Sequence, residues 1–197
     1  MRIFKSIKNF VNKRNFGVRR ADKSDVDFIA EQIFIGEREG NFLNNKSSEN
    51  IDDLKWHISQ VIAGVPVPTI SYEGTPELEY QEYFIYGSKK TGSIGFFKFH
   101  EGNATYPLRE IEIRLLSMDE KFKGNGHGSN LLRIILEIAR LSEFHAVMFR
   151  CFDKSAKMIK VLEKNSFELQ GRDPDGAGIY KFYDMHLIQL EALEGVE

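Results

Sequence analysis

Cysteine is almost absent from this chain: Cys151 is the single one among 197 residues. One thiol cannot build an internal disulfide framework, and the histidines form no cluster at metal-ligand spacing, so neither a disulfide scaffold nor a metal site is predicted. No apolar run approaches the roughly 18 residues of a membrane-spanning helix. The N-terminus also lacks an apolar core followed by a small-residue cleavage site. We therefore expect a cytoplasmic protein without a bound metal.

Strong charge of either sign is missing as well, since 27 Lys and Arg against 29 Asp and Glu leave a net charge of −2. General nucleic-acid binders are typically basic, so this balance makes nucleic acid an unlikely partner. The 42% hydrophobic and 28% charged residues are typical of a soluble globular protein, and 197 residues suit one domain. Residues 1–20 are the exception, with seven basic residues and no acidic one.

The first residues combine this basic charge with an apolar stripe, which predicts an amphipathic helix over residues 1–14. Such a helix could contact a membrane surface or nucleic acid, or pack on its own domain or on a partner subunit. We divide the chain into this basic segment (1–16), a main domain (17–188) and an acidic tail (189–197). The stripe consists of Ile3, Phe4, Ile7, Phe10 and Val11.

The main domain alternates between strand and helix patterns. Apolar residues at a 3.6-residue period predict helices, the first capped by Ser24, and short apolar or alternating runs predict strands. Residues 64–76 hold three of the five prolines and are expected to form a loop. Strands interrupted by helices at these lengths predict a mixed sheet covered by helices. Helices are expected after Ser24 and over 51–62, 129–141 and 155–164, and strands over 17–21, 80–86, 93–100, 111–118, 146–151, 167–170 and 178–187.

A glycine-rich turn leads from the strand 111–118 into the helix 129–141. It reads Lys123-Gly124-Asn125-Gly126-His127-Gly128-Ser129, with glycine at alternate positions. Glycine is costly where a helix begins, because it loses more conformational freedom on folding than other residues. In return it bares backbone N–H groups at a helix N-terminus, where the macrodipole favours an anion. The turn therefore predicts a phosphate-binding cradle, with the imidazole of His127 facing solvent.

The spacing within this cradle excludes two familiar phosphate loops. A dinucleotide-binding G-x-G-x-x-G loop needs Gly or Ala where Ser129 stands, and a Walker loop needs Lys and then Ser or Thr after its last glycine. The order Lys123, x, x, Gly126, x, Gly128 instead resembles the coenzyme A pyrophosphate loop of the GNAT superfamily of N-acetyltransferases, usually Arg or Gln, x, x, Gly, x, Gly or Ala. The element order over residues 17–188 is similar to that family too.

This resemblance implies a fold, a co-substrate and a reaction. The fold would be α/β (α+β), a GNAT-like mixed, mostly antiparallel sheet flanked by helices and splayed around the coenzyme A site. Acetyl-CoA would donate an acetyl group directly to a primary amine, without a metal. The strand before the cradle would polarise the thioester carbonyl with its N–H groups, and Ser155 would contact the pantetheine or simply cap its helix. The residues expected to bind the cofactor are Leu116, Ser117, Met118, Lys123, Gly124, Asn125, Gly126, His127, Gly128, Ser129 and Ser155.

Glu112 is the candidate catalytic base. A lysine-type amine with a pKa of about 10.4 is protonated at neutral pH, so its attack on a thioester requires a proton acceptor. Glu112 lies eleven residues before Lys123, the spacing at which the histone-acetyltransferase branch of the family has its catalytic glutamate. The alternatives are that Glu112 is a solvated strand residue paired with Arg114 or a neighbour, or that Glu110 serves in its place. Strand alternation would place on one face Glu112, Arg114, Leu116 and Met118.

The family's closing Tyr-x-x-x-Gly-Phe motif is altered here, with Leu162 for the tyrosine and Ser166 for the glycine before Phe167. That tyrosine commonly protonates the departing thiolate, which Leu162 cannot do. Thiolate is a fair leaving group near pH 8, so an acid is helpful without being obligatory. The residues that could substitute are Tyr180, Tyr183, Ser155 and Cys151.

The acceptor is not identified by the sequence. Glutamates follow the first helix and surround the proline-rich segment, where the family has its acceptor cleft, so a small cationic amine or a protein amino group is expected; a merely solvated acidic face is the alternative. Two other functions stay open: an acyl-CoA-binding regulatory or interaction module with little turnover, and acetylation of aminoacyl-tRNA. A homodimer is a further possibility, because dimers are common in the family. The glutamates are Glu37, Glu39, Glu73, Glu77, Glu79 and Glu82.

Overall fold

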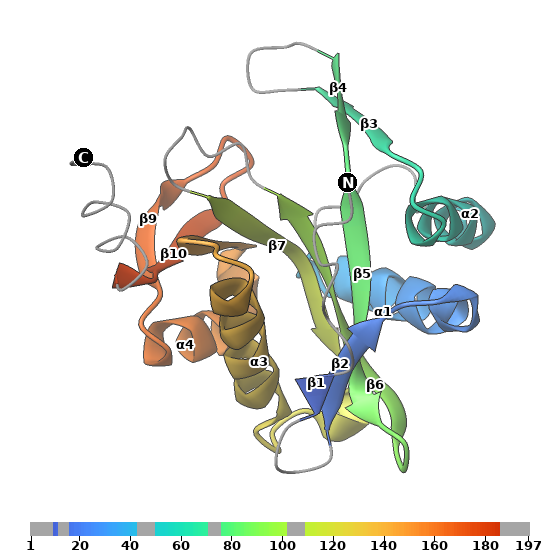
Figure 1. Cartoon of the computed structure of the whole chain (residues 1–197), viewed down its shortest axis with the longest axis horizontal. Coiled ribbons are helices and arrows are strands. Elements are labelled where there is room, and N and C mark those ends of the chain that lie inside the picture. Colours follow the sequence, from blue (N-terminus) through green and yellow to red (C-terminus); the bar gives the residue numbers. More distant parts are fainter. Residues whose placement is uncertain (1–9, 12–15, 43–49, 71–75, 102–108, 186–197) are drawn as a thin grey trace.

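An eight-stranded sheet organises the computed structural model, which describes residues 10–11, 16–42, 50–70, 76–101 and 109–185. The strand order is β1-β2-β5-β6-β7-β8-β10-β9, and every neighbouring pair is antiparallel except β7 with β8 (Figure 1). The mixed, mostly antiparallel sheet predicted from the sequence is therefore confirmed. Its strands are β1 (Phe10–Val11), β2 (Gly17–Arg20), β5 (Gln81–Ser88), β6 (Gly92–Glu101), β7 (Glu110–Met118), β8 (Ala146–Cys151), β9 (Glu168–Arg172) and β10 (Gly178–Tyr183).

Helices cover both faces of this sheet. Helices α1 (Val26–Arg38) and α2 (Ile51–Ile62) lie on one face, and α3 (His127–Leu141) and α4 (Ala156–Lys164) lie on the other (Figure 1). Each face has its own buried apolar cluster, so the sheet is a shared wall between two cores. We call these the α1/α2 face and the α3/α4 face.

The apolar period of α3 places its buried side chains on the sheet as predicted. The helix begins at His127, two residues earlier than Ser129, so part of the glycine turn forms its first turn. Because a parallel strand pair needs a crossover connection, α3 is also the element that returns the chain from β7 to β8. The buried residues of α3 are Leu131, Leu132, Ile134, Ile135, Ile138 and Ala139.

The pairing of β7 with β8 is short. It runs from Glu110 opposite Ala146 to Ile113 opposite Phe149, and the rest of β7 pairs only with β6 among the described residues. The two strands thus diverge beyond Ile113, as the predicted splayed sheet requires. Peptide groups on the β8 side of the last part of β7 are left without a strand partner there.

A bulge in β7 changes which side chains share a face. On β6, Lys98 and Phe99 are consecutive, whereas their partners Leu115 and Ile113 are two residues apart, so Arg114 is the extra residue. Beyond the bulge, Leu116 and Met118 pack into the core of the α3/α4 face. The prediction that these two residues share a face with Glu112 is therefore wrong, because strand alternation is interrupted at Arg114.

Three local expectations also need correction. Residues 64–76 are not all loop, since β3 (Val67–Ile70) and β4 (Pro76–Glu79) form an antiparallel ribbon. Ser24 is not the helix cap, because the carboxylate of Asp22 accepts its backbone N–H and Asp25 completes the capping box. Phe10–Val11, expected on a helical stripe, form a strand against β2. The remainder of segment 1–9, residues 12–15 and the tail 189–197 lie outside the described residues.

None of the helices in the described ranges is long and apolar enough to cross a membrane.

Candidate functional site

The glycine turn presents an uncovered helix N-terminus. Gly124 and Gly126 have φ values of +81° and +78°, a left-handed conformation that favours glycine. The first helical hydrogen bond is donated by the backbone N–H of Asn130 to the carbonyl of Gly126. The N–H groups of Gly128 and Ser129, directly before Asn130, therefore have no acceptor within the helix. A Cβ placed on Gly124, Gly126 or Gly128 would meet no atom within 4 Å, so the space above these amides is open.

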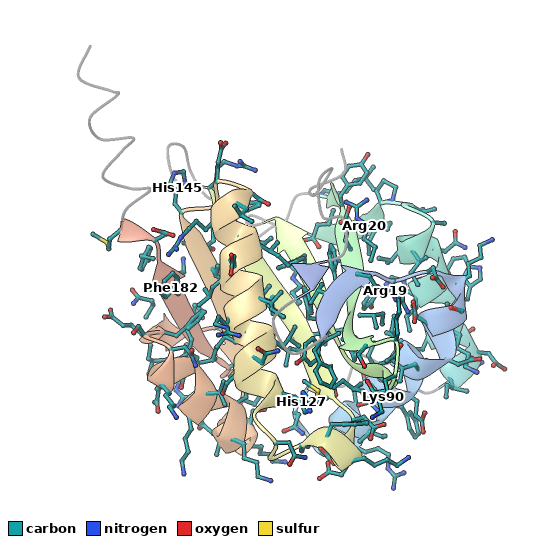
Figure 2. The ribbon with its side chains drawn as sticks, turned by 60° about the horizontal axis from the view of Figure 1, so that its bottom comes forward. Arg19, Arg20, Lys90, His127, His145 and Phe182 are labelled. Atoms are coloured by element: carbon teal, nitrogen blue, oxygen red, sulfur yellow. The ribbon has the colours of Figure 1, made fainter. Side chains whose placement is uncertain are left out.

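The side chain of His127 does not face solvent as the sequence suggested. It is half-buried at the start of α3 (Figure 2). Its ring lies 4.7 Å from that of Phe16 and 6.0 Å from that of Phe122, and its Nδ1 is 3.3 Å from the hydroxyl of Tyr86. The same hydroxyl accepts a hydrogen bond from the amide of Asn130 at 2.7 Å. The side chain of His127 therefore links the glycine turn to β5.

Lys123 lies at the mouth of the cradle. Its ammonium is 2.5 Å from the carboxylate of Glu120 and 3.9 Å from that of Glu39, which follows the last residue of α1. The side chain is one-third exposed. A phosphate reaching the cradle would therefore compete with Glu120 for this cation.

The end of α1 also contacts the start of α4. The hydroxyl of Ser155 donates to the amide oxygen of Asn41 at 3.2 Å, and the amide nitrogen of Asn41 donates to Glu39 at 2.8 Å. Ser155 makes no side-chain capping bond to α4. Together with Lys123, these contacts link the cradle, α1 and α4. The predicted cofactor residue Ser155 is thus brought to the side of the sheet where β7 and β8 diverge.

The β7 residues predicted to bind the cofactor have their side chains engaged elsewhere. Leu116 and Met118 pack in the core, and the hydroxyl of Ser117 donates to Gln32 of α1 at 3.1 Å. What these residues can offer a ligand is their backbone, on the strand edge that β8 leaves unpaired.

Glu112 is buried between two guanidinium groups on the α1/α2 face. Its side chain is 3% exposed, with Oε2 at 3.2 Å from Nε of Arg114 and Oε1 at 3.0 Å from Nε of Arg150. Arg114 continues the network with two hydrogen bonds to Glu79, at 2.8 and 3.1 Å. Glu112 is therefore an ion-paired carboxylate, held where the β7–β8 ladder ends.

Further titratable groups line the same network. Burial, with the positive charge of Arg114, lowers the pKa of His100. The same two causes lower the pKa of Lys98 to about 8. Burial opposes ionisation of Glu79, but hydrogen bonding by Gln81 and the charge of Arg114 lower its pKa overall. Burial thus opposes the charged forms of His100 and Lys98 beside the ion-paired Glu112.

The residues proposed to replace the missing tyrosine are mostly remote from open space. Leu162 itself is fully buried in the α3/α4 core. Burial raises the pKa of the Cys151 thiol to about 12, and burial also raises the pKa of Tyr180. Tyr183 pairs with Ala146, at the opposite end of β8 from Cys151. Among these candidates Ser155 has the most direct link to the cradle region.

Two of the glutamates expected to attract a cationic acceptor are already paired. Glu79 binds Arg114, and Glu82 lies 3.1 Å from Arg20. Glu73 lies outside the described residues. The negative charges of Glu79 and Glu82 are therefore balanced by Arg114 and Arg20.

Sequence reasoning missed Arg150 and Asn41 as parts of this region. Arg150 is a single cation inside the apolar strand Ala146–Cys151, and every other residue of that strand is buried. That isolated charge was the available signal. Asn41 carries no comparable signal, because its contact with Ser155 joins residues 114 positions apart.

A cavity of about 390 Å³ lies elsewhere, between the start of β5 and the end of α2. Arg20, Tyr80 and Tyr83 are among its lining residues. Tyr86, by contrast, contacts the cradle from the far end of β5. The cavity is therefore not part of the candidate site.

Comparisons with known proteins agree with this geometry. The sequence model of the acetyltransferase (GNAT) family matches residues 56–167. No curated protein matches the chain significantly.

Solved structures share the fold. A spermidine N-acetyltransferase from Vibrio cholerae, in complex with CoA and spermine, is 12% identical with a TM-score of 0.64, covering 89% of this chain and 99% of that one. A putative acetyltransferase from Salmonella typhimurium, with its cofactor acetyl-CoA, is 16% identical with a TM-score of 0.61, covering 86% and 94%. The aminoglycoside acetyltransferase AAC(6')-Ib, in complex with coenzyme A, is 16% identical with a TM-score of 0.62, covering 89% and 99%.

The first prediction separates ligand binding at the cradle from folding. An aspartate in place of Gly128 would lie in the first turn of α3, where a negative charge stabilises a helix by about 0.3–1 kcal/mol. The same charge would repel a pyrophosphate. We expect Gly128→Asp to keep or raise the thermal midpoint while weakening coenzyme A binding at least about tenfold, measured by calorimetric titration. Gly128→Asn is the uncharged control of equal size, and equal affinities for the two variants would contradict an anion site here.

The second prediction concerns the charge of Lys98. Its pKa of about 8 in the folded protein is below the ordinary value of 10.5, so the unfolded chain holds the proton more strongly. Folding therefore carries a cost at pH 7 that fades as the pH rises from 8 to 10.5. We expect Lys98→Met to raise the free energy of unfolding by about 1–3 kcal/mol at pH 7, and by progressively less towards pH 10. Urea unfolding across this range measures it, with Lys160→Met at an exposed position of α4 as control; a gain independent of pH would refute the titration.

Proposed function

The chain belongs to the acetyltransferase (GNAT) family, and we propose that it transfers the acetyl group of acetyl-CoA directly to the primary amine of a small molecule. The observation that carries this proposal is the uncovered N-terminus of α3 beside an unpaired edge of β7. One feature suits a pyrophosphate and the other suits an extended thioester arm. Fold neighbours described with CoA, acetyl-CoA and spermine support the choice of donor and of an amine acceptor.

The donor would bind from the cradle along β7. The N–H groups of Gly128 and Ser129 would hydrogen-bond the pyrophosphate, and Lys123 would exchange Glu120 for a phosphate oxygen. The arm would follow the edge from Leu116 to Met118, whose N–H groups would polarise the thioester carbonyl. Ser155, at the start of α4, would contact the pantetheine from the other side.

The reaction forms a bond between the amine nitrogen and the acetyl carbon while the bond from that carbon to sulfur breaks. The amine first loses a proton, and coenzyme A leaves as a thiol after taking one. Since the sulfur leaves as a moderately acidic thiol, catalysis depends more on deprotonating the amine than on a strong acid. The absence of the family's tyrosine at Leu162 is compatible with this order of importance.

Glu112 is our proposed acceptor of the amine proton. It lies on the α1/α2 face, one residue before the end of the β7–β8 ladder and four residues before Leu116, where the arm would reach β7. Each carboxylate oxygen contacts a guanidinium group. These contacts hold the carboxylate in place and leave neither oxygen free to bind an ammonium group directly. We therefore propose that the proton passes through water.

Release of thiol by acetyl-CoA in the presence of an amine tests the function. The panel should include free amino acids, polyamines, aminoglycosides and short peptides, with coenzyme A binding measured in parallel. We expect amine-dependent release above the hydrolytic background. Intact coenzyme A binding without release on any acceptor would instead favour the alternative of a CoA-binding regulatory module.

The pH profile of Glu112→Gln tests the base. At high pH a larger fraction of the amine is already deprotonated, so the loss of a base matters less. We expect kcat of Glu112→Gln to fall roughly 10- to 100-fold at pH 7 and to approach the wild-type value as the pH rises.

The comparison variant is Glu110→Gln, on the same strand, whose carboxylate is 2.6 Å from Lys181. We expect it to keep the wild-type profile. A parallel drop at every pH for Glu112→Gln would assign Glu112 to structure alone, and a pH-dependent loss in Glu110→Gln would move the role to Glu110.

A further inference from the structure

Within the charge network around Glu112, the most exposed side chains are those of two arginines. The side chains of Arg150 and Arg114 are 43% and 29% exposed, whereas those of Glu112, Glu79 and Asp173 are 3%, 12% and 6% exposed. The acids therefore lie beneath the arginines. A ligand that reaches this network from solvent therefore meets the guanidinium groups first.

Arg150 keeps part of its hydrogen-bonding capacity available. Its Nε faces Glu112, but Nη1 is 3.8 Å from Asp173, beyond hydrogen-bond distance. Asp173 in turn accepts the backbone N–H of Ala177 at 2.9 Å. Among the described residues, the terminal nitrogens of Arg150 donate no hydrogen bond. Arg114 differs, since both of its terminal nitrogens already bind Glu79.

An ion pair with Glu112 also restrains the guanidinium of Arg150. One carboxylate oxygen of Glu112 pairs with Nε of Arg150 and the other pairs with Nε of Arg114. A single buried carboxylate therefore positions both guanidinium groups. The planar fork of an arginine matches a carboxylate with two parallel hydrogen bonds. Pre-orienting the fork removes part of the entropic cost of binding such a group.

The place of Arg150 in the fold relates this fork to the reaction. It follows Phe149, the last residue of β8 that pairs with β7, and it shares the α1/α2 face with Glu112. It therefore stands where the strands begin to diverge, beside the proposed base and close to the thioester end of the arm. An acceptor held here by a carboxylate could direct its amine towards both.

We propose that Arg150 binds a carboxylate of the acceptor, with Arg114 adding positive charge beside it, and that the acceptor is a small amine carrying a carboxylate, such as an amino acid. The proposal rests on the proposed acetyltransferase function and refines its acceptor. The paired state of Glu79 and Glu82 supports it, because neither carboxylate is left to attract a polycation. In place of the cationic acceptor suggested by the composition, we thus propose an amine that also carries a carboxylate.

Matched acceptor pairs provide the test. Thiol release should be measured for L-amino acids against their amides, for example methionine against methioninamide, with spermidine included. We expect kcat/KM of the acid to exceed that of the amide by roughly 10- to 100-fold, the range of a charge-assisted hydrogen-bonded pair. Equal values for acid and amide, or a preference for spermidine, would overturn the proposal.

Variants of Arg150 test whether this residue binds the carboxylate. We expect Arg150→Gln to bring acid and amide to within about twofold of each other, mainly through KM of the acid, and Arg150→Lys to restore part of the preference. The matched control is Arg140→Gln, whose arginine is also partly exposed and also binds a buried carboxylate, Asp184, through Nε at 2.7 Å. This control likewise removes an arginine from a buried carboxylate, but Arg140 lies at the far end of α3. An acid preference that survives in Arg150→Gln would overturn the assignment.

A binding measurement separates this proposal from the acetyltransferase function. N-acetylmethionine and its amide can be titrated calorimetrically into the complex with coenzyme A, with no chemistry required. Tighter binding of the acid to wild type, lost in Arg150→Gln, would support the arginine site even if no acceptor in the panel were acetylated. Equal binding of both compounds to wild type would refute it.

Discussion

The early end of the β7–β8 ladder is the constraint on which the rest of this structure depends. Parallel strands of one sheet require a crossover, and here the crossover is α3, which starts directly after the glycine turn. The strands pair over four residues each and then separate. An unpaired strand edge and an uncovered helix N-terminus are therefore produced by the same connection. The strand edge and the helix N-terminus both supply backbone N–H groups, so the proposed donor site consists of peptide groups rather than side chains.

Side chains accordingly serve other tasks in this region. The ring of His127 packs edge-on against Phe16 and contacts Tyr86, while Ser117 binds Gln32 of α1. These contacts fix the backbone that a ligand would read. A donor site of this kind tolerates side-chain variation but depends on glycine where the turn is left-handed, at Gly124 and Gly126.

Much of this could be predicted from the sequence. The glycine spacing and the 3.6-residue period of α3 are local properties, and both described the structure well. The bulge at Arg114 was not predictable in the same way, because it arises from how β7 pairs with β6 rather than from the residues of β7 alone. It reverses the faces of Leu116 and Met118, so an error of one residue in pairing became an error in placing side chains. An ion-paired Glu112 was among the alternatives read from the sequence, but its second partner Arg150 and the pair of Arg114 with Glu79 join distant positions and were not predicted.

The pairing of Glu112 with two arginines sets a physical conflict within the proposed mechanism. An anchor for two guanidiniums must remain ionised, because a protonated carboxyl would leave two partly buried cations with reduced compensation. A base must accept a proton during each turnover. The conflict is eased if an acceptor carboxylate binds Arg150, since that new anion offsets the charge that Glu112 would lose on protonation. Binding of an acidic acceptor and proton transfer to Glu112 would then be coupled through one guanidinium, so the acceptor itself would prepare the base that deprotonates it.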